Sequence, residues 1–148
     1  MPAPGGNRHR MTDQQVVSRH RIAGAHRGSS NLRNADSHKI LYHRWINELW
    51  AGHRIAEELV SADFVGHWPA HDVHGPQGLQ AVIDSTRGTL RELLLIVDVG
   101  PFIDGDMLFA RWIGTGSGKD GPARFTGNDI LRIANGKVVE YWSGTSQA

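Results

Sequence analysis

Apolar residues change their spacing once along this chain, close to Leu90. Before that point they recur three and four residues apart, as Leu41, Trp45 and Leu49 do, which is typical of one face of a helix. After it they alternate with polar residues in short runs separated by turn residues, which indicates strands. The order of elements, with helices first and a meander of strands last, predicts an α+β fold. We expect the helices to cover one face of a curved, mainly antiparallel sheet.

Three helices and one short extended segment are expected in the first part. The first helix should be capped by Asp36 or Ser37 and stop at Gly52. A short helix should follow over residues 53–60, and an extended segment over residues 63–68. Gly75-Pro76 should begin the third helix, because proline suits a first helical turn.

The second part should form four strands connected by tight turns. Asp104-Gly105-Asp106 and Asn135-Gly136 are turn signals, and Asn-Gly is the stronger hairpin signal. Residues 116–121 are glycine-rich but lack the P-loop pattern, so we expect a hairpin loop there. The expected strands cover residues 93–99, 107–115, 123–134 and 137–143. A curved sheet covered by helices leaves a cavity suited to apolar ligands.

Charge divides the chain into two parts. Residues 1–35 hold six Arg and one Asp, and we predict a basic, partly disordered N-terminal extension. Residues 36–148 hold ten Lys or Arg and fourteen Asp or Glu, so the predicted domain has no basic stripe for nucleic acid. No apolar run is long enough for a membrane span. The absence of cysteine excludes thiol catalysis and suits a cytoplasmic protein.

Six ordered segments together resemble the SnoaL-like polyketide cyclases of the nuclear-transport-factor-2-like superfamily. Their order and spacing match the family over about residues 36–145. They are Trp45-Ile46-Asn47-Glu48-Leu49-Trp50, Asp63-Phe64-Val65-Gly66-His67, Gly75-Pro76-Gln77-Gly78-Leu79, Ala110-Arg111-Trp112-Ile113-Gly114-Thr115-Gly116, Gly127-Asn128-Asp129-Ile130-Leu131-Arg132-Ile133 and Asn135-Gly136-Lys137-Val138-Val139-Glu140-Tyr141-Trp142.

The resemblance implies a cone-shaped α+β barrel that forms a homodimer and needs no cofactor. In the cyclases, an acidic residue on the third strand of the meander acts as general acid/base in an intramolecular aldol closure of a polyketide ester. Asp129 matches that position. The cyclases often carry a histidine after the second strand's Thr-Gly-Thr segment, whereas this chain has Thr115-Gly116-Ser117-Gly118.

Asp129 is the first candidate for catalysis. It alternates in phase with Phe125, Leu131 and Ile133, so its side chain should point inward. Burial would raise the pKa of the carboxyl group and suit it to remove a C–H proton near neutral pH. Alternatively, Asp129 pairs structurally with an arginine. Arg111 is the candidate partner, and it also has the chemistry to hold a substrate anion.

His67 is the third catalytic candidate, because an imidazole can polarise a carbonyl group or carry a proton. The resemblance places His67 at the pocket mouth. His71 and His74 lie nearby, but Pro69 interrupts any helix that would bring the three rings together. We therefore expect no metal site.

Aromatic residues should form both the core and the walls of the pocket. Tyr42 has the further possibility of donating a hydrogen bond to an oxyanion. The substrate-binding candidates are Tyr42, Trp45, Trp68, Trp112, Phe125 and Trp142.

Three functions are compatible with these residues. The first is a cofactor-independent cyclase or isomerase acting on an apolar or polycyclic carbonyl substrate. In it Asp129 removes a proton, and His67 or Arg111 stabilises the enolate. The second is epoxide hydrolysis, with Asp129 and Arg111 orienting water. The third is a non-catalytic module for small-molecule binding or dimerisation.

Overall fold

A computed structural model describes residues 32–147, and residues from Asn34 onward form one compact unit. Most of the basic extension expected over residues 1–35 lies outside the described residues. Residues 32–44 are α-helical and continue into the π-helical turn η1 (Trp45–Leu49). The expected cap at Asp36 or Ser37 is therefore wrong, because the helix has already formed at residue 32.

Two further helices follow, the short α2 (Ala56–Leu59) and the longer α3 (Gly75–Thr89). The predicted Gly75-Pro76 helix start is confirmed, with proline in the first turn of α3. The expected short helix over residues 53–60 is present in its second half, as α2.

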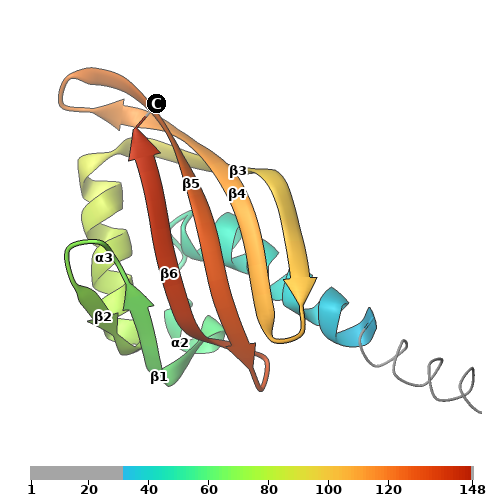
Figure 1. Cartoon of the computed structure of the whole chain (residues 1–148). Helices are drawn as coiled ribbons and strands as arrows, with labels where there is room; N and C mark the ends of the chain where they lie inside the picture. The colour runs from blue at the N-terminus through green and yellow to red at the C-terminus, as the bar shows by residue number, and fades with distance from the viewer. Residues whose placement is uncertain (1–31, 148) are drawn as a thin grey trace, which may run out of the picture. The chain divides into compact units, whose positions relative to one another are not determined.

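Six strands form a single sheet in the order β2-β1-β6-β5-β4-β3 (Figure 1). Only β1 and β6 run parallel, and the other neighbours are antiparallel. The last four strands form the predicted meander. The bounds are β1 Val60–His67, β2 Asp72–His74, β3 Arg91–Asp104, β4 Met107–Gly118, β5 Gly121–Ala134 and β6 Lys137–Gln147.

The hairpin turns follow the local sequence. Asn135 and Gly136 both have positive φ, 53° and 75°, as a two-residue type I′ turn requires. The glycine-rich segment differs from the expected loop. Its residues continue β4, and Gly118 pairs with Gly121, so only Lys119 and Asp120 form the turn.

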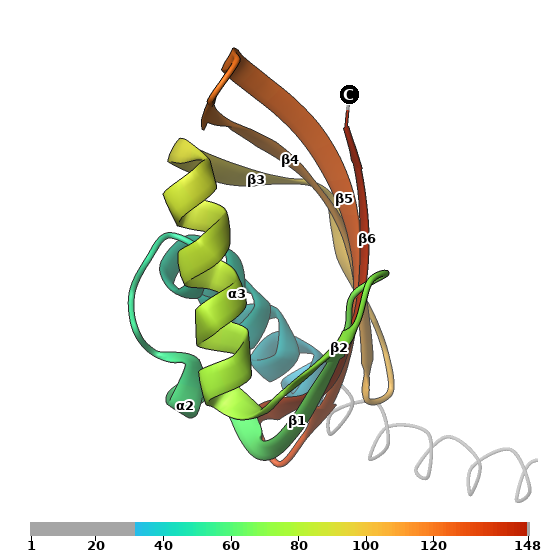
Figure 2. The same ribbon diagram turned by 90° about the vertical axis from the view of Figure 1, so that its left-hand side faces the viewer.

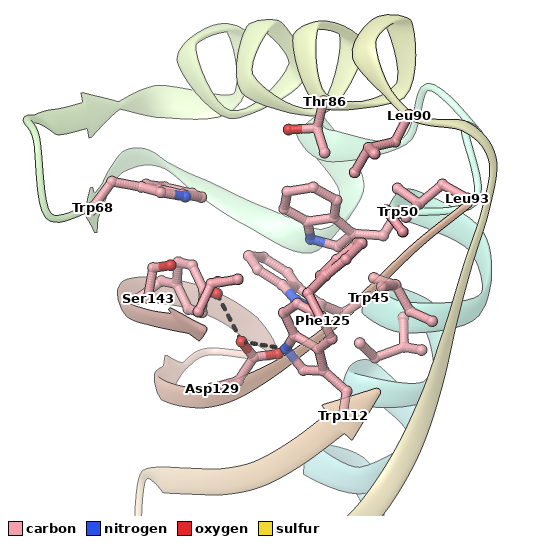
Figure 3. Close-up of a pocket in the computed structure, with 15 residues that line it drawn as sticks. Trp45, Trp50, Trp68, Thr86, Leu90, Leu93, Trp112, Phe125, Asp129 and Ser143 are labelled. Carbon is pink, nitrogen blue, oxygen red and sulfur yellow. Dashed lines mark hydrogen bonds between the residues drawn. The ribbon is translucent and has the colours of Figure 1, made fainter. Parts of the chain in front are cut away.

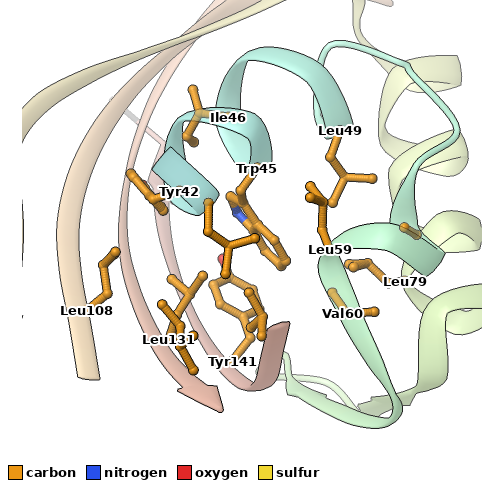
Figure 4. Close-up of a cluster of buried hydrophobic side chains, with 14 of the residues drawn as sticks. Tyr42, Trp45, Ile46, Leu49, Leu59, Val60, Leu79, Leu108, Leu131 and Tyr141 are labelled. Atoms are coloured by element: carbon orange, nitrogen blue, oxygen red, sulfur yellow. The ribbon is translucent and has the colours of Figure 1, made fainter. Parts of the chain in front are cut away.

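The helices lie on the concave side of the curved sheet, which does not close into a barrel (Figure 2). This confirms the α+β cone predicted from the sequence. The core lies where η1 and α3 meet the inward side chains of β4, β5 and β6 (Figure 4). Within residues 32–147, no helix is long and apolar enough to cross a membrane.

Candidate active site

A cavity of about 360 Å³ lies between the helices and the concave face of the sheet (Figure 3). Most of its wall is apolar. The polar groups of the lining are the indole N–H groups, one tyrosine hydroxyl group, one carboxyl group and the hydroxyl groups of Thr86, Ser143 and Thr145. Its aromatic lining residues are Trp45, Trp50, Trp68, Trp112, Phe125 and Tyr141.

Three of the aromatic rings lie directly against glycines of the strands. At each of these glycines a Cβ atom would come closer to the ring than real Cβ atoms do. The glycines thus provide the space into which the rings fold. The pairs are Trp68 on Gly66, Trp112 on Gly127 and Phe125 on Gly114.

Asp129 provides the only carboxyl group among the residues that line this cavity. Its side chain is 2% exposed and accepts three hydrogen bonds. Oδ1 accepts from Trp112 Nε1 at 3.0 Å and from Tyr141 Oη at 2.7 Å. Oδ2 accepts from Tyr42 Oη at 2.8 Å. All three donors are uncharged side chains, so no cation compensates the carboxylate in this network.

The three donors leave one position on the carboxylate free. An ionised carboxylate offers about four lone-pair sites, two on each oxygen. Two donors fill both sites on Oδ1, and Tyr42 fills one on Oδ2. A proton can therefore add to Oδ2 without displacing any donor. Asp129 can change between its ionised and protonated forms within one fixed arrangement of neighbours.

Burial dominates the electrostatics of this group. Loss of water raises the pKa of Asp129, while the hydrogen bonds from Tyr141, Trp112 and Tyr42 oppose the rise. Burial and the neighbouring carboxyl group also raise the pKa of Tyr141 and of Tyr42 far above the ordinary value. Both tyrosines therefore keep their protons and act as donors.

Four of the six predicted substrate-binding residues line the cavity: Trp45, Trp68, Trp112 and Phe125. Tyr42 is fully buried behind the cavity, where it contacts Asp129 instead of the open space. The inward face predicted for Asp129 matches the burial along β5, where Gly127, Leu131 and Ile133 are buried with it. The alternative pairing of Asp129 with an arginine does not occur among the described residues.

Arg111 lies on the opposite, convex face of the sheet. On β4 it is Leu108, Ala110 and Trp112 that are buried, so Arg111 points outward with Phe109. Its guanidinium faces Asp98 at 3.5 Å. The expected role of Arg111 at Asp129 therefore does not fit this geometry. Both sets of alternating residues on β4 are largely apolar, so alternation alone did not identify the inward set.

His67 and Trp142 also lie on the convex face, not at the pocket mouth. Their rings stack with centroids 5.5 Å apart. His67 Nδ1 contacts Asp72 at 2.9 Å, and Nε2 contacts Glu140 at 2.7 Å. The hydrogen bonds to Glu140 and Asp72 raise the pKa of His67. The contacts tie the turn between β1 and β2 to β6, so His67 has a structural place here.

The histidine cluster does not converge on one point. The two carboxylates at His67 bind opposite ring nitrogens, so they face away from each other. Within residues 32–147, no group of three or more His, Asp or Glu side chains is arranged to hold a metal ion.

Tyr141 is the site residue that the sequence did not indicate. Arg132 and Ile133 are adjacent on β5, yet they pair with Glu140 and Val138 on β6, so Val139 is an extra, bulged residue. The bulge lets both Val138 and Tyr141 face inward, although they lie three residues apart. Simple alternation from Val138 would point Trp142 inward instead, whereas Trp142 lies on the convex face against His67. Tyr141 faces inward because it pairs with the buried Leu131, and no spacing pattern in the sequence marks this register.

Solved structures share this fold at low sequence identity. A protein from Jannaschia sp. CCS1, assigned as a SnoaL-like polyketide cyclase, has a TM-score of 0.69 at 16% identity, covering 75% of this chain and 86% of that chain. A protein from Bacillus cereus ATCC 10987, assigned as a polyketide cyclase, has a TM-score of 0.65 at 23% identity, covering 72% of each chain. TsrD from Streptomyces laurentii has a TM-score of 0.66 at 20% identity, covering 75% of this chain and 89% of that chain. No curated protein matches the sequence.

The SnoaL-like domain family matches residues 42–141, which include η1, α2, α3, the first five strands and the part of β6 that carries Tyr141. The matched range covers most of the compact unit and contains every donor to Asp129. The chain therefore belongs to the SnoaL-like domain family.

Proposed function

We propose that this protein is a cofactor-independent cyclase or isomerase in which Asp129 removes a proton from a carbon next to a carbonyl group. The observation that carries the proposal is a single buried carboxyl group at an apolar, aromatic cavity, with only neutral donors around it. A buried carboxyl group with a raised pKa is a better base near neutral pH than an exposed one.

The reaction follows from the free lone pair on Oδ2. The substrate's C–H bond breaks, its proton adds to Oδ2, and the electron pair moves onto the carbonyl oxygen as an enolate. In a cyclase the enolate carbon then attacks a second carbonyl group of the same molecule, and in an isomerase the proton returns at another carbon. The assignments of the Jannaschia and Bacillus proteins as polyketide cyclases support the first outcome.

The cavity favours an uncharged, ring-containing substrate. Asp129 is the only ionisable group besides Tyr141 among the lining residues, so no cation is present there to bind a carboxylate or phosphate. Flat aromatic walls suit planar rings, which stack on indoles. A polyketide-like carbonyl compound meets these requirements.

Epoxide hydrolysis has less support from the geometry. It needs an arginine and a carboxylate that together orient water, but Arg111 faces Asp98 on the convex side. Non-catalytic binding predicts a solvent-facing Asp129, whereas the carboxyl group is buried.

The proposal is tested with 2-tetralone, a bicyclic ketone with acidic protons next to its carbonyl group. In D₂O, proton NMR measures how fast deuterium replaces these protons. The wild-type protein should accelerate exchange over buffer, and Asp129→Asn should abolish the acceleration. Asp63→Asn is the matched control, because it removes an exposed carboxylate on β1 that does not line the cavity. Binding of 2-tetralone is measured by quenching of tryptophan fluorescence. If the wild-type protein binds 2-tetralone but does not accelerate exchange, the enzymatic proposal is refuted.

We also propose that the protein is a homodimer formed through the convex face of β3, β4 and β5. Six large apolar side chains are exposed there, namely Leu94, Ile96, Val99, Phe102, Phe109 and Ile130. Four of them, Val99, Phe102, Phe109 and Ile130, border a hollow of about 270 Å³. Arg111 and Asp98 lie within this face, so two copies related by a two-fold axis could exchange these charges. An exposed apolar surface of this extent is typical of an interface.

A further inference from the structure

Two tyrosines donate to the same carboxyl group, but only one of them reaches the cavity. Tyr141 Oη lies 2.7 Å from Asp129 Oδ1, and Tyr141 lines the cavity. Tyr42 Oη lies 2.8 Å from Oδ2, but Tyr42 is fully buried and absent from the lining. A ligand in the cavity can therefore contact Tyr141 but not Tyr42.

We propose that Tyr141 is a second catalytic residue, which donates its hydroxyl proton in a hydrogen bond to the enolate oxygen, and that Tyr42 is a positioning residue for Asp129. This inference rests on the proposed proton abstraction. It fills a gap, because His67 and Arg111 lie on the convex face and cannot stabilise charge in the cavity.

The chemistry at Asp129 explains when Tyr141 becomes free to donate. The ionised carboxylate is a strong acceptor and holds the hydroxyl group of Tyr141. As the substrate's proton moves onto Oδ2, the carboxyl group loses its negative charge and becomes a weaker acceptor. Trp112 still donates to Oδ1, so that oxygen keeps a partner when Tyr141 turns away. In the same step the hydroxyl group rotates about its C–O bond toward the substrate's carbonyl oxygen, where negative charge is developing.

The step is balanced within the protein and substrate. One C–H bond breaks and one O–H bond forms on Oδ2, while the electron pair of the C–H bond becomes enolate charge. Tyr141 contributes a hydrogen bond and keeps its proton, as its strongly raised pKa requires. The reverse sequence returns the proton to carbon and the hydroxyl group to Asp129.

Ser143 is the competing donor. It lines the cavity and pairs with Asp129 across the two strands. Tyr141 is favoured because its hydroxyl group already lies within hydrogen-bond distance of the base. A base and a donor so close together can act on the α-carbon and the oxygen of one carbonyl group.

The test compares Tyr141→Phe, Tyr42→Phe and Ser143→Ala in the 2-tetralone exchange assay across pH. Both tyrosine variants remove one hydrogen bond to the carboxylate, so both should move the pH profile upward. Only Tyr141→Phe should also lower the plateau rate, by about 100-fold, as expected for loss of one oxyanion donor. Equal plateau losses in the two tyrosine variants would overturn the assignment, and so would a loss confined to Ser143→Ala.

A binding measurement separates this inference from the proposed function. 2-Naphthol imitates the enol of 2-tetralone, and naphthalene has the same rings without oxygen. Tyr141→Phe should weaken 2-naphthol binding about tenfold and leave naphthalene binding unchanged, whereas Tyr42→Phe should preserve the ratio of the two affinities. If neither the wild type nor any variant catalyses exchange, the proposed function fails. The ratio of the 2-naphthol and naphthalene affinities then decides by itself whether Tyr141 contacts the ligand oxygen. An unchanged ratio in Tyr141→Phe overturns the assignment.

Discussion

Replacement of Gly127 by alanine should disturb the cavity through one indole ring. Trp112 and Gly127 stand opposite each other on β4 and β5. The new Cβ atom would lie 2.8 Å from Cη2 of Trp112 and closer still to Cζ2 and Cε2. Carbon atoms pack at about 3.5–4.0 Å, so the ring must move by more than ~1 Å. That movement carries Nε1 away from Oδ1 of Asp129, to which it now donates at 3.0 Å.

The cost has two main parts. Overpacking a well-filled core costs about 1–3 kcal/mol. Loss of a hydrogen bond to a buried carboxyl group costs about 1–3 kcal/mol more. Alanine also lowers the conformational entropy of the unfolded chain, which stabilises the folded state by about 0.4–1 kcal/mol and offsets part of the loss. We therefore expect Gly127→Ala to lower the free energy of unfolding by about 1–6 kcal/mol.

Urea unfolding followed by circular dichroism measures this change, and the indole N–H resonance of Trp112 reports the lost hydrogen bond. Gly88→Ala is the control, because it makes the same chemical change in α3 with no atom within 4 Å of the new Cβ. That variant should gain about 0.5–1 kcal/mol, since alanine favours a helix over glycine. If Gly127→Ala unfolds at the wild-type urea concentration with an unshifted Trp112 resonance, the packing argument fails.

Three further predictions concern other parts of the molecule. The pKa of Asp129 is raised in the folded state, so the folded protein holds this proton more tightly than the unfolded chain does. The free energy of unfolding of the wild type, relative to that of Asp129→Asn, should therefore fall as pH rises from about 3.9 through the raised pKa. Urea unfolding of both proteins across pH measures this difference. His67 also has a raised pKa, so its stabilisation should be complete below about pH 6.5 and lost as pH rises through its folded value. A constant stability difference between wild type and His67→Gln from about pH 6 to 9 would contradict this. Phe102→Asp should convert a dimer to a monomer in sedimentation equilibrium, because Phe102 is 60% exposed on the convex face. A monomeric wild type would refute the interface.

Local patterns were enough to place most helices and strands. The start of α3 at Gly75-Pro76 and the Asn135-Gly136 hairpin were predicted from residues that have strong backbone preferences of their own. The start of the first helix and the extent of β4 were predicted less well. A glycine-rich segment can continue a strand when its partner strand supplies hydrogen bonds, and Gly118 does so by pairing with Gly121.

The candidate site was predicted in part, and strand phase explains why Arg111 and Trp142 were misplaced. Asp129 was identified from the family resemblance, and the alternation of polar and apolar residues along β5 indicated that its side chain points inward. Arg111 and Trp142 were assigned to the cavity, but β4 has apolar residues on both faces and β6 is bulged at Val139. His67 was placed at the pocket mouth by the family resemblance, whereas in this chain it stacks on Trp142 on the convex face. A change of one residue in strand phase turns a side chain to the opposite face.

The sequence by itself determined the α+β class, the order of helices and strands, and the inward carboxyl group of Asp129, because these depend on the spacing of nearby residues. Only the tertiary structure decided which side chains surround that group. Tyr42 lies 87 residues from Asp129 in sequence, and Tyr141 reaches it because of a bulge. Such contacts depend on strand register and on the packing of helix against sheet, which spacing along the chain does not specify.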